Sequence, residues 1–192
     1  MTTLIRLTFL AVVPFYFSGC AWAPQKLTIR AQPQFSKSAV GDGTTVAVLV
    51  VDARPSALIG YRGLDSQLAK IQTEQDVVRI VQNSLIEGLK GKGFNATPYD
   101  RQSSLTLRAE IRQIEYSTSM DMWKGSIHAK AVVAAYSKKA DRVHDRVYRV
   151  EKDQAVLEAP SAQINERLIN SAISEVLERI VEDQNLTEFL AH

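Results

Sequence analysis

Cysteine is scarce in this chain, which has one among its 192 residues, Cys20. An intramolecular disulfide is therefore excluded. Neither sign of charge dominates, because 23 Lys and Arg residues are balanced by 21 Asp and Glu residues, for a formal net charge of +2. That balance gives no electrostatic reason to expect nucleic acid or another polyanion as a partner. With 45% hydrophobic and 23% charged residues, the composition is that of an ordinary globular protein.

Motifs of known catalytic and metal sites are also missing. The chain contains no GxGxxG, Walker loop, GxSxG, HExxH or CxxC pattern. Its three histidines are His128, His144 and His192. If a hairpin turn is centred near Lys139, His144 lies opposite Ala134 and about 20 Å from His128 along the strand, too far to share a metal. We therefore expect no metal, no cofactor and no enzymatic activity.

The apolar segments are too short to span a bilayer. The longest lies near the start of the chain, at residues 7–17, and is interrupted by Pro14. Its eleven residues match the length of the hydrophobic region of a signal peptide, whereas a membrane span takes about 20 residues. The motif Phe17-Ser18-Gly19-Cys20 follows and resembles the bacterial lipobox, although Phe17 stands where leucine is usual. The alternatives are an uncleaved anchor or an ordinary secreted protein. A buried core cysteine is disfavoured, because the Pro-containing stretch after Cys20 has no pattern able to pack it.

The lipobox resemblance implies a location and a domain organisation. Residues 1–19 would be a signal peptide that is removed, residues 20–44 a lipidated N-terminus with a flexible tether, and residues 45–192 a single globular domain. Cys20 would carry three acyl chains, palmitate among them, and attach the protein to a membrane. Ala21 occupies the position where aspartate marks retention in the inner membrane in enteric-type sorting. We therefore expect an outer-membrane lipoprotein on the periplasmic face.

The periodicity of the remaining chain predicts an α+β fold. A β-branched run at residues 45–51 indicates a central strand, and apolar spacing at 77–89 indicates a helix. Alternation from residue 105 onward predicts an antiparallel meander that ends near residue 150. A second helix is expected at residues 164–183. Together these elements predict a two-layer sandwich, in which an antiparallel-rich sheet of about four to five strands is covered on one face by two helices.

One polar cluster could form at the end of the central strand. Asp52 ends the β-branched run, and Arg54 and Tyr61 follow it. Sites in open sheets often lie at strand ends, so these three residues are a candidate ligand or catalytic site. The alternative is an ion pair between Asp52 and Arg54 that only holds the loop in place.

A second candidate lies near the expected hairpin tip. Met120, Met122 and Trp123 gather there, and methionine and tryptophan are common at binding surfaces. These three residues are therefore a candidate contact for a partner. The alternative is a tip that folds back beneath the second helix.

Several segments together resemble the YajG family of bacterial outer-membrane lipoproteins. Besides the lipobox, they are Val51-Asp52-Ala53-Arg54-Pro55, Leu58-Ile59-Gly60-Tyr61-Arg62, Gly93-Phe94 and Leu186-Thr187-Glu188-Phe189-Leu190. The resemblance implies an uncharacterized lipoprotein with no assigned activity. It brings no functional residue beyond Cys20.

Two functions remain open at this point. The first is a non-catalytic accessory role, in which the anchored protein binds another envelope protein or a cell-wall component, for example in envelope transport or outer-membrane assembly. The second is a periplasmic enzyme or small-ligand binder that acts on cell-wall or lipid fragments near Asp52. The lack of a catalytic motif favours the first. The partner and the oligomeric state stay open.

Overall fold

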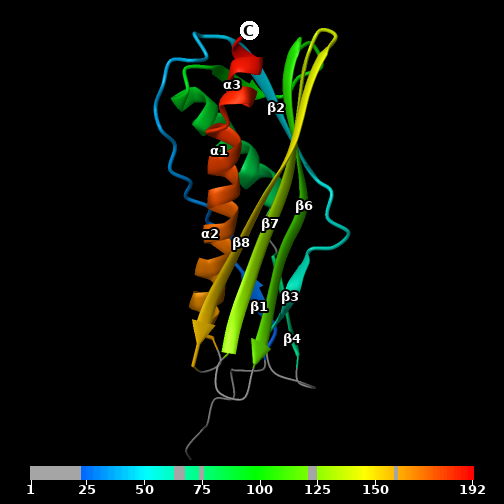
Figure 1. Cartoon of the computed structure of the whole chain (residues 1–192). Helices are drawn as coiled ribbons and strands as arrows, with labels where there is room; N and C mark the ends of the chain where they lie inside the picture. Colours follow the sequence, from blue (N-terminus) through cyan, green and yellow to red (C-terminus); the bar gives the residue numbers. More distant parts are fainter. Residues whose placement is uncertain (1–22, 63–67, 74–75, 121–124, 158–159) are drawn as a thin grey trace, which may run out of the picture.

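One eight-stranded sheet and three helices make up the described part of the chain (Figure 1). The computed structural model describes residues 23–62, 68–73, 76–120, 125–157 and 160–192. The strands are β1 (Gln25–Leu27), β2 (Thr45–Asp52), β3 (Leu58–Arg62), β4 (Ala69–Thr73), β5 (Asn95–Pro98), β6 (Leu105–Met120), β7 (Gly125–Lys139) and β8 (Arg142–Val156). The helices are α1 (Val77–Gly91), α2 (Ala162–Val181) and α3 (Gln184–Ala191). The predicted α+β class is confirmed.

The sheet is mixed, and the predicted sheet of about four to five strands is wrong. Its main path is β1-β4-β3-β6-β2-β5, and β7 and β8 extend it from the other edge of β6. Among the described residues, four strand pairs are parallel and three are antiparallel, although the longest pairs, β6–β7 and β7–β8, are antiparallel. "Antiparallel-rich" therefore fits the meander and not the sheet as a whole.

Two of the unpredicted strands are β3 and β4, which occupy the stretch after Pro55. Each has only five residues, too few for periodicity to be distinctive. Gly60 makes the pairing of β3 with β6 possible, because a Cβ at that position would lie 1.9 Å from the carbonyl oxygen of Tyr116. Close approach of two backbones is a common reason for glycine inside a strand.

The helices cover one face of the sheet and enclose the core. Val46, Val48 and Val50 point from β2 toward this side, where α1 packs. The stripe predicted for the last helix is buried along α2, with Ile173, Leu177 and Ile180 at most 2% exposed. The structure has three helices where two were predicted, because the last predicted helix is interrupted at Asp183. The Asp183 carboxylate accepts a hydrogen bond from the Asn185 N–H and so caps the start of α3.

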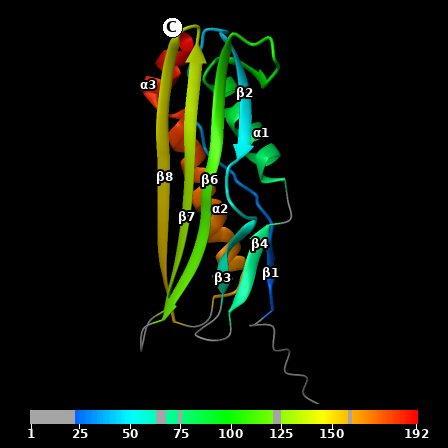
Figure 2. The same ribbon diagram turned by 90° about the vertical axis from the view of Figure 1, so that its right-hand side faces the viewer.

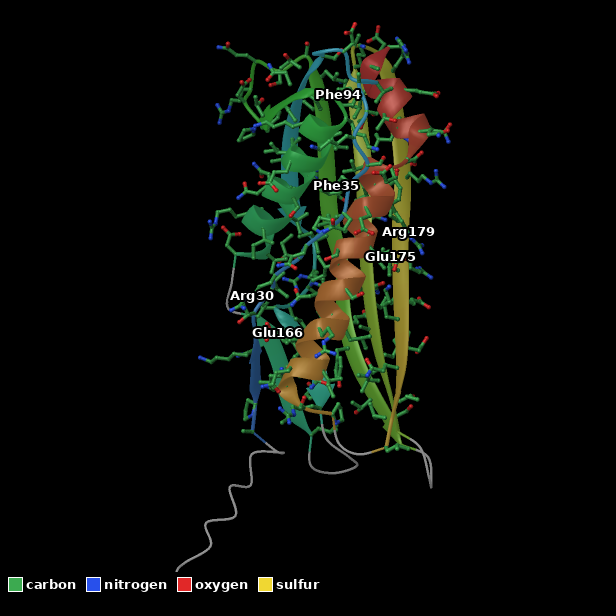
Figure 3. The ribbon with its side chains drawn as sticks, turned by 90° about the vertical axis from the view of Figure 1, so that its left-hand side faces the viewer. Arg30, Phe35, Phe94, Glu166, Glu175 and Arg179 are labelled. Atoms are coloured by element: carbon green, nitrogen blue, oxygen red, sulfur yellow. The ribbon has the colours of Figure 1, made fainter. Side chains whose placement is uncertain are left out.

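The segment after β1 is not the flexible tether that the sequence predicted. It runs beside α2 (Figure 3), and every second backbone N–H donates to a side chain four residues farther along the helix. The pairs are Arg30 with Asn170 (2.7 Å), Gln32 with Ser174 (2.9 Å), Gln34 with Glu178 (2.6 Å) and Ser36 with Glu182 (2.8 Å). The spacing of the donors matches that of the acceptors, because two extended residues span about 6.6 Å and four helical residues rise about 6.0 Å.

Apolar side chains of β1 and of the segment after it complete the core. Leu27 and Ile29 are each 3% exposed, and Phe35 packs against the same cluster. Gly88 of α1 leaves room for that ring, since a Cβ there would lie 2.9 Å from Phe35 Cε2. The folded unit therefore includes β1 and the segment after it, ahead of the predicted boundary at residue 45.

Candidate binding surface

Asp52 and Arg54 form an ion pair at the end of β2. Arg54 Nε lies 2.8 Å from Asp52 Oδ1, and Arg54 Nη2 lies 2.7 Å from Asp52 Oδ2. The Arg54 hydrogen bonds hold the pKa of Asp52 below its ordinary value of 3.8. Both carboxylate oxygens are engaged, and the backbone N–H of Arg54 also donates to Oδ1. The structure thus shows the loop-holding ion pair that was the alternative for these residues.

Tyr61 does not join this pair. Asp52 lies opposite Ile111 of β6, whereas Gly60, the neighbour of Tyr61, lies opposite Tyr116. Five residues along one strand correspond to about 17 Å. The predicted three-residue cluster is therefore corrected to a two-residue ion pair, with Tyr61 half-exposed farther along the sheet.

The other sequence candidates fall largely outside the described residues. Cys20, Met122 and Trp123 are not among them, and Met120 is the last residue of β6, opposite Gly125. The predicted contact at this tip and the lipidation of Cys20 stay predictions.

The two hairpin histidines lie farther apart than predicted. The turn centres on Ala140 and Asp141, so His144 pairs with Ser137 and not with Ala134. His128 is nine residues from Ser137 along β7, or about 30 Å. Its Nδ1 lies 2.8 Å from Asp153 Oδ1. In the described part of the chain, no three potential metal ligands gather.

The sheet face that points away from the helices is open along β2, β6, β7 and β8 (Figure 2). We name it the uncovered face. Strand register places its side chains in rows, since alternate residues of each strand point to the same side. One row consists of Leu49, Arg108, Tyr136 and Asp145, and the next of Val51, Glu110, Ala134 and Val147.

The uncovered face exposes apolar and aromatic side chains among charges. Val143 is 63% exposed, Val147 50% and Tyr99, which follows β5, 43%. Arg112 stacks over the Tyr136 ring and hydrogen-bonds its hydroxyl. A hollow of about 600 Å³ opens between Leu49 and Tyr99 at one end of the face. Arginine, tyrosine and exposed aliphatic side chains on a broad surface suit contact with a macromolecule.

The prediction of helices on one face implied an uncovered face, but sequence reasoning did not identify it as a candidate site or assign the residues that form it. The alternation of Thr106, Arg108 and Glu110 with buried residues indicated a strand with one exposed side. The strands that align with it on both sides could not be assigned from that alternation.

A buried hydrogen-bond chain anchors β1 to β6 and α2. Tyr116 donates its hydroxyl to Asn165 Oδ1 at 2.6 Å, and Asn165 Nδ2 donates to Gln25 Oε1 at 3.0 Å. Gln25 Nε2 in turn donates to the Ala162 carbonyl at 2.9 Å. Asn165 is fully buried, and burial raises the pKa of Tyr116. β1 therefore lies toward the end of the sheet where β6 and β7 approach their connection (Figure 1).

A family model described as an uncharacterized lipoprotein matches residues 31–191. The chain belongs to this lipoprotein family. It is therefore an envelope lipoprotein, as its N-terminal pattern predicted. None of the helices in the described ranges has the length and apolar character needed to cross a membrane.

Solved structures resemble this lipoprotein in fold. A protein from Xanthomonas campestris superposes with a TM-score of 0.58 at 16% identity, over 86% of this chain and 94% of its own. A minor lipoprotein from Acinetobacter baumannii gives a TM-score of 0.50 at 9% identity, over 75% of this chain and 90% of its own. Such low identities establish a shared fold and carry no function. A search of curated proteins found no match.

Proposed function

We propose that this lipoprotein is a non-catalytic accessory protein that binds another envelope component through its uncovered face. The observation that carries the proposal is the composition of that face, where Val143, Val147 and Tyr99 are exposed beside arginines and Tyr136. Exposed aliphatic side chains together with arginine and tyrosine on one broad face suit contact with a macromolecule. The alternative, chemistry at Asp52, is not favoured because its carboxylate is bound to Arg54.

We also propose that the protein is held by lipid on Cys20 at the periplasmic face of the outer membrane, as a member of the YajG group. Ala21 supports the outer membrane over the inner one. Gln25 is five positions after Cys20, a reach of at most about 18 Å. The lipid would therefore hold the Gln25 end of the fold close to the bilayer, and the long strands β6 to β8 would carry the uncovered face away from it.

Site-specific photo-crosslinking in intact cells tests the binding surface. The probe amino acid replaces Tyr99 or Arg112 on the uncovered face of the full chain, and Glu87, exposed on α1, serves as the control position. We expect both face positions to capture one defined envelope component and the Glu87 position to capture none. A third probe at Trp123 examines the tip.

The four positions separate the outcomes. Capture from Trp123 alone would move the binding site to the tip and contradict the proposal. Equal capture from Glu87 and from the face positions would show that the face has no special role. If Asp52→Asn abolished a measurable activity while the face variants kept it, the enzyme or ligand-binding alternative would replace this proposal.

A further inference from the structure

The hollow at one end of the uncovered face is rich in hydrogen-bond donors. Its volume is about 600 Å³, and two cations line it, Arg108 of β6 and Lys138 of β7. The hydroxyls of Ser104 and Thr106 line it as well. The described residues around this hollow include no Asp or Glu in its lining. A lining of this kind attracts an anion that accepts several hydrogen bonds.

Strand pairing brings the two cations within reach of one ligand. Thr106 lies directly opposite Lys138, and Arg108 is two residues farther along β6 on the same face. Diagonal neighbours on one face of a sheet lie about 7 to 8 Å apart, close enough for long side chains to meet. One compact anion can therefore contact both cations and the Thr106 hydroxyl.

Three of these donors have no partner within the described chain. The Lys138 ammonium forms no ion pair there, and the hydroxyls of Ser104 and Thr106 form no hydrogen bond. Asp145 of β8 is diagonal to Lys138, but it lies outside the lining of the hollow and does not pair with that ammonium. These donors are thus available to a ligand.

Two other carboxylates near the hollow are already engaged. Glu110 is shared by two guanidinium groups, with its Oε1 2.8 Å from Arg108 Nη2 and its Oε2 3.5 Å from Arg112 Nη2. Asp100 holds the loop that follows Tyr99, since its Oδ1 accepts a hydrogen bond from the Gln102 N–H at 2.8 Å. Neither carboxylate lines the hollow, so its positive charge is only partly offset.

We propose that this hollow binds a phosphate monoester. The inference deepens the proposed function and rests on it, because the phosphate would belong to the component that the uncovered face recognises. A phosphate monoester carries a charge of about −1.5 to −2 at pH 7 and three strong acceptor oxygens, which match two cations and the nearby hydroxyls. A carboxylate has one charge and two oxygens and would leave some of these donors unused. Tyr99 and Leu49 also line the hollow and would contact the carbon part of the ligand.

The hollow lies far from the end of the fold that carries β1 (Figure 2). Thr106 is ten positions before Tyr116, whose hydroxyl bonds Asn165 in the hydrogen-bond chain of β1, or about 33 Å along β6. A lipid on Cys20 would hold the β1 end close to the bilayer. The headgroups of that bilayer would then be out of reach, which favours a soluble or partner-borne monoester as the ligand.

Ligand-detected NMR of the full-length protein in detergent micelles tests the site, with phenyl phosphate as the probe. We expect saturation transfer from the protein to the probe, and displacement of the probe by inorganic phosphate. Arg108→Gln combined with Lys138→Gln should weaken the affinity at least about tenfold. Arg79→Gln combined with Lys90→Gln is the matched control, because it removes the same two charges from exposed positions of α1.

The control variant should keep the affinity within about twofold of the unaltered protein, because its charges lie outside the hollow. Equal losses in the two double variants would mean a general attraction to net charge and would overturn the proposal. Absence of saturation transfer to phenyl phosphate in the unaltered protein would also overturn it.

Comparison of ligands tests the chemistry. Benzoate carries the same ring with a carboxylate and should bind at least about tenfold more weakly; equal or tighter binding would overturn the preference for phosphate. Phenyl phosphate should bind more weakly at about pH 5.5 than at about pH 7.5, because a phosphate monoester takes up a proton with a pKa of about 6. An unchanged affinity would contradict the match of two charges. If a short-chain phosphatidylglycerol displaced the probe better than inorganic phosphate, a lipid headgroup would replace the monoester.

Photo-crosslinking from Arg112 separates this inference from the proposed function. Capture of an envelope component by a protein that does not bind phenyl phosphate would overturn the inference and leave the proposed function in place. Binding of phenyl phosphate without capture from Arg112 or Tyr99 would confirm the phosphate site and reject the proposed function. If both hold, we expect Arg108→Gln combined with Lys138→Gln to lower capture from Arg112 as well.

Discussion

The two faces of the sheet are built from the same strands but differ in what covers them. On the covered face, alternate residues such as Val48 and Leu107 are fully buried beneath the helices and the N-terminal segment. On the uncovered face, the residues between them, such as Leu49 and Arg108, reach solvent. Because side chains alternate with a period of two, one strand can supply core to one side and a contact surface to the other. Stability should therefore depend on the first face and recognition on the second.

Removal of the N-terminal segment should give the largest effect. A chain that begins at residue 23 should unfold cooperatively, whereas one that begins at residue 45 loses the burial of Leu27, Ile29 and Phe35. Full burial of a side chain such as Leu27 or Ile29 contributes about 1.5 to 3 kcal/mol, and the partly buried Phe35 less, against a total stability of about 5 to 15 kcal/mol for a typical domain. Thermal unfolding of both chains, followed by circular dichroism, checks this. Equal melting temperatures would show that the covered face is complete without the segment.

A smaller effect is expected from one core side chain. Ile173→Ala on the covered face should lower the free energy of unfolding by about 2 to 5 kcal/mol, because it leaves a cavity under α2. Val143→Ala on the uncovered face should change it by no more than about 0.5 kcal/mol. Urea unfolding of the two variants measures the difference. Similar losses would mean that the faces do not differ in the way we describe.

Breaking the buried hydrogen-bond chain should cost less unfolding free energy than a cavity in the core but more than a substitution on the surface. Asn165→Ala leaves Gln25 and Tyr116 without their shared partner and should cost about 1 to 3 kcal/mol of unfolding free energy. Gln163→Ala is the control, since Gln163 is exposed on the same helix. Equal urea midpoints for the two variants would contradict a stabilising role for the chain of hydrogen bonds.

Acid should weaken the attachment of the N-terminal segment to α2. Burial alone raises the pKa of Glu182, but hydrogen bonds from Lys92 and Ser36 outweigh it and hold that pKa below its ordinary value of 4.5. Because the folded-state pKa is depressed, this stabilisation is complete above about pH 5 and is lost as the pH falls through the folded-state value. The melting temperature should therefore fall less steeply from pH 5 to pH 3 in Glu182→Gln than in the unaltered protein. If the melting temperatures of the two proteins fell in parallel with pH, Glu182 would not be responsible for the loss of stability in acid.

The smallest effect on stability is expected on the uncovered face. Tyr99→Ser combined with Arg112→Ser should leave the melting temperature nearly unchanged, since both side chains are exposed, yet abolish capture of the partner by a probe placed at Val143 on the same face. The triple variant Met120→Ser, Met122→Ser and Trp123→Ser tests the tip in the same assay. If only the triple variant lost capture, recognition would belong to the tip and not to the uncovered face.

Local patterns predicted the elements whose signals are long. The β-branched run of β2, the apolar stripes of α1 and α2 and the alternation in β6 all correspond to observed elements. Short elements were missed, because five residues such as Leu58–Arg62 give no periodicity to measure. The start of α3 was missed for a related reason: Asp183 looks like one more polar residue of a continuous helix until its capping bond to Asn185 is seen.

The sequence by itself determined the envelope location, the α+β class and the buried side of each long helix, since each is encoded by residues that are near neighbours along the chain. Only the tertiary structure decided the eight-strand order, the docking of residues 28–36 on α2 and the place of β8 at the edge of the sheet. These features depend on contacts between residues more than a hundred positions apart, or on which strands become neighbours. Periodicity specifies which side of a strand is apolar, but the neighbouring elements decide whether that side is covered.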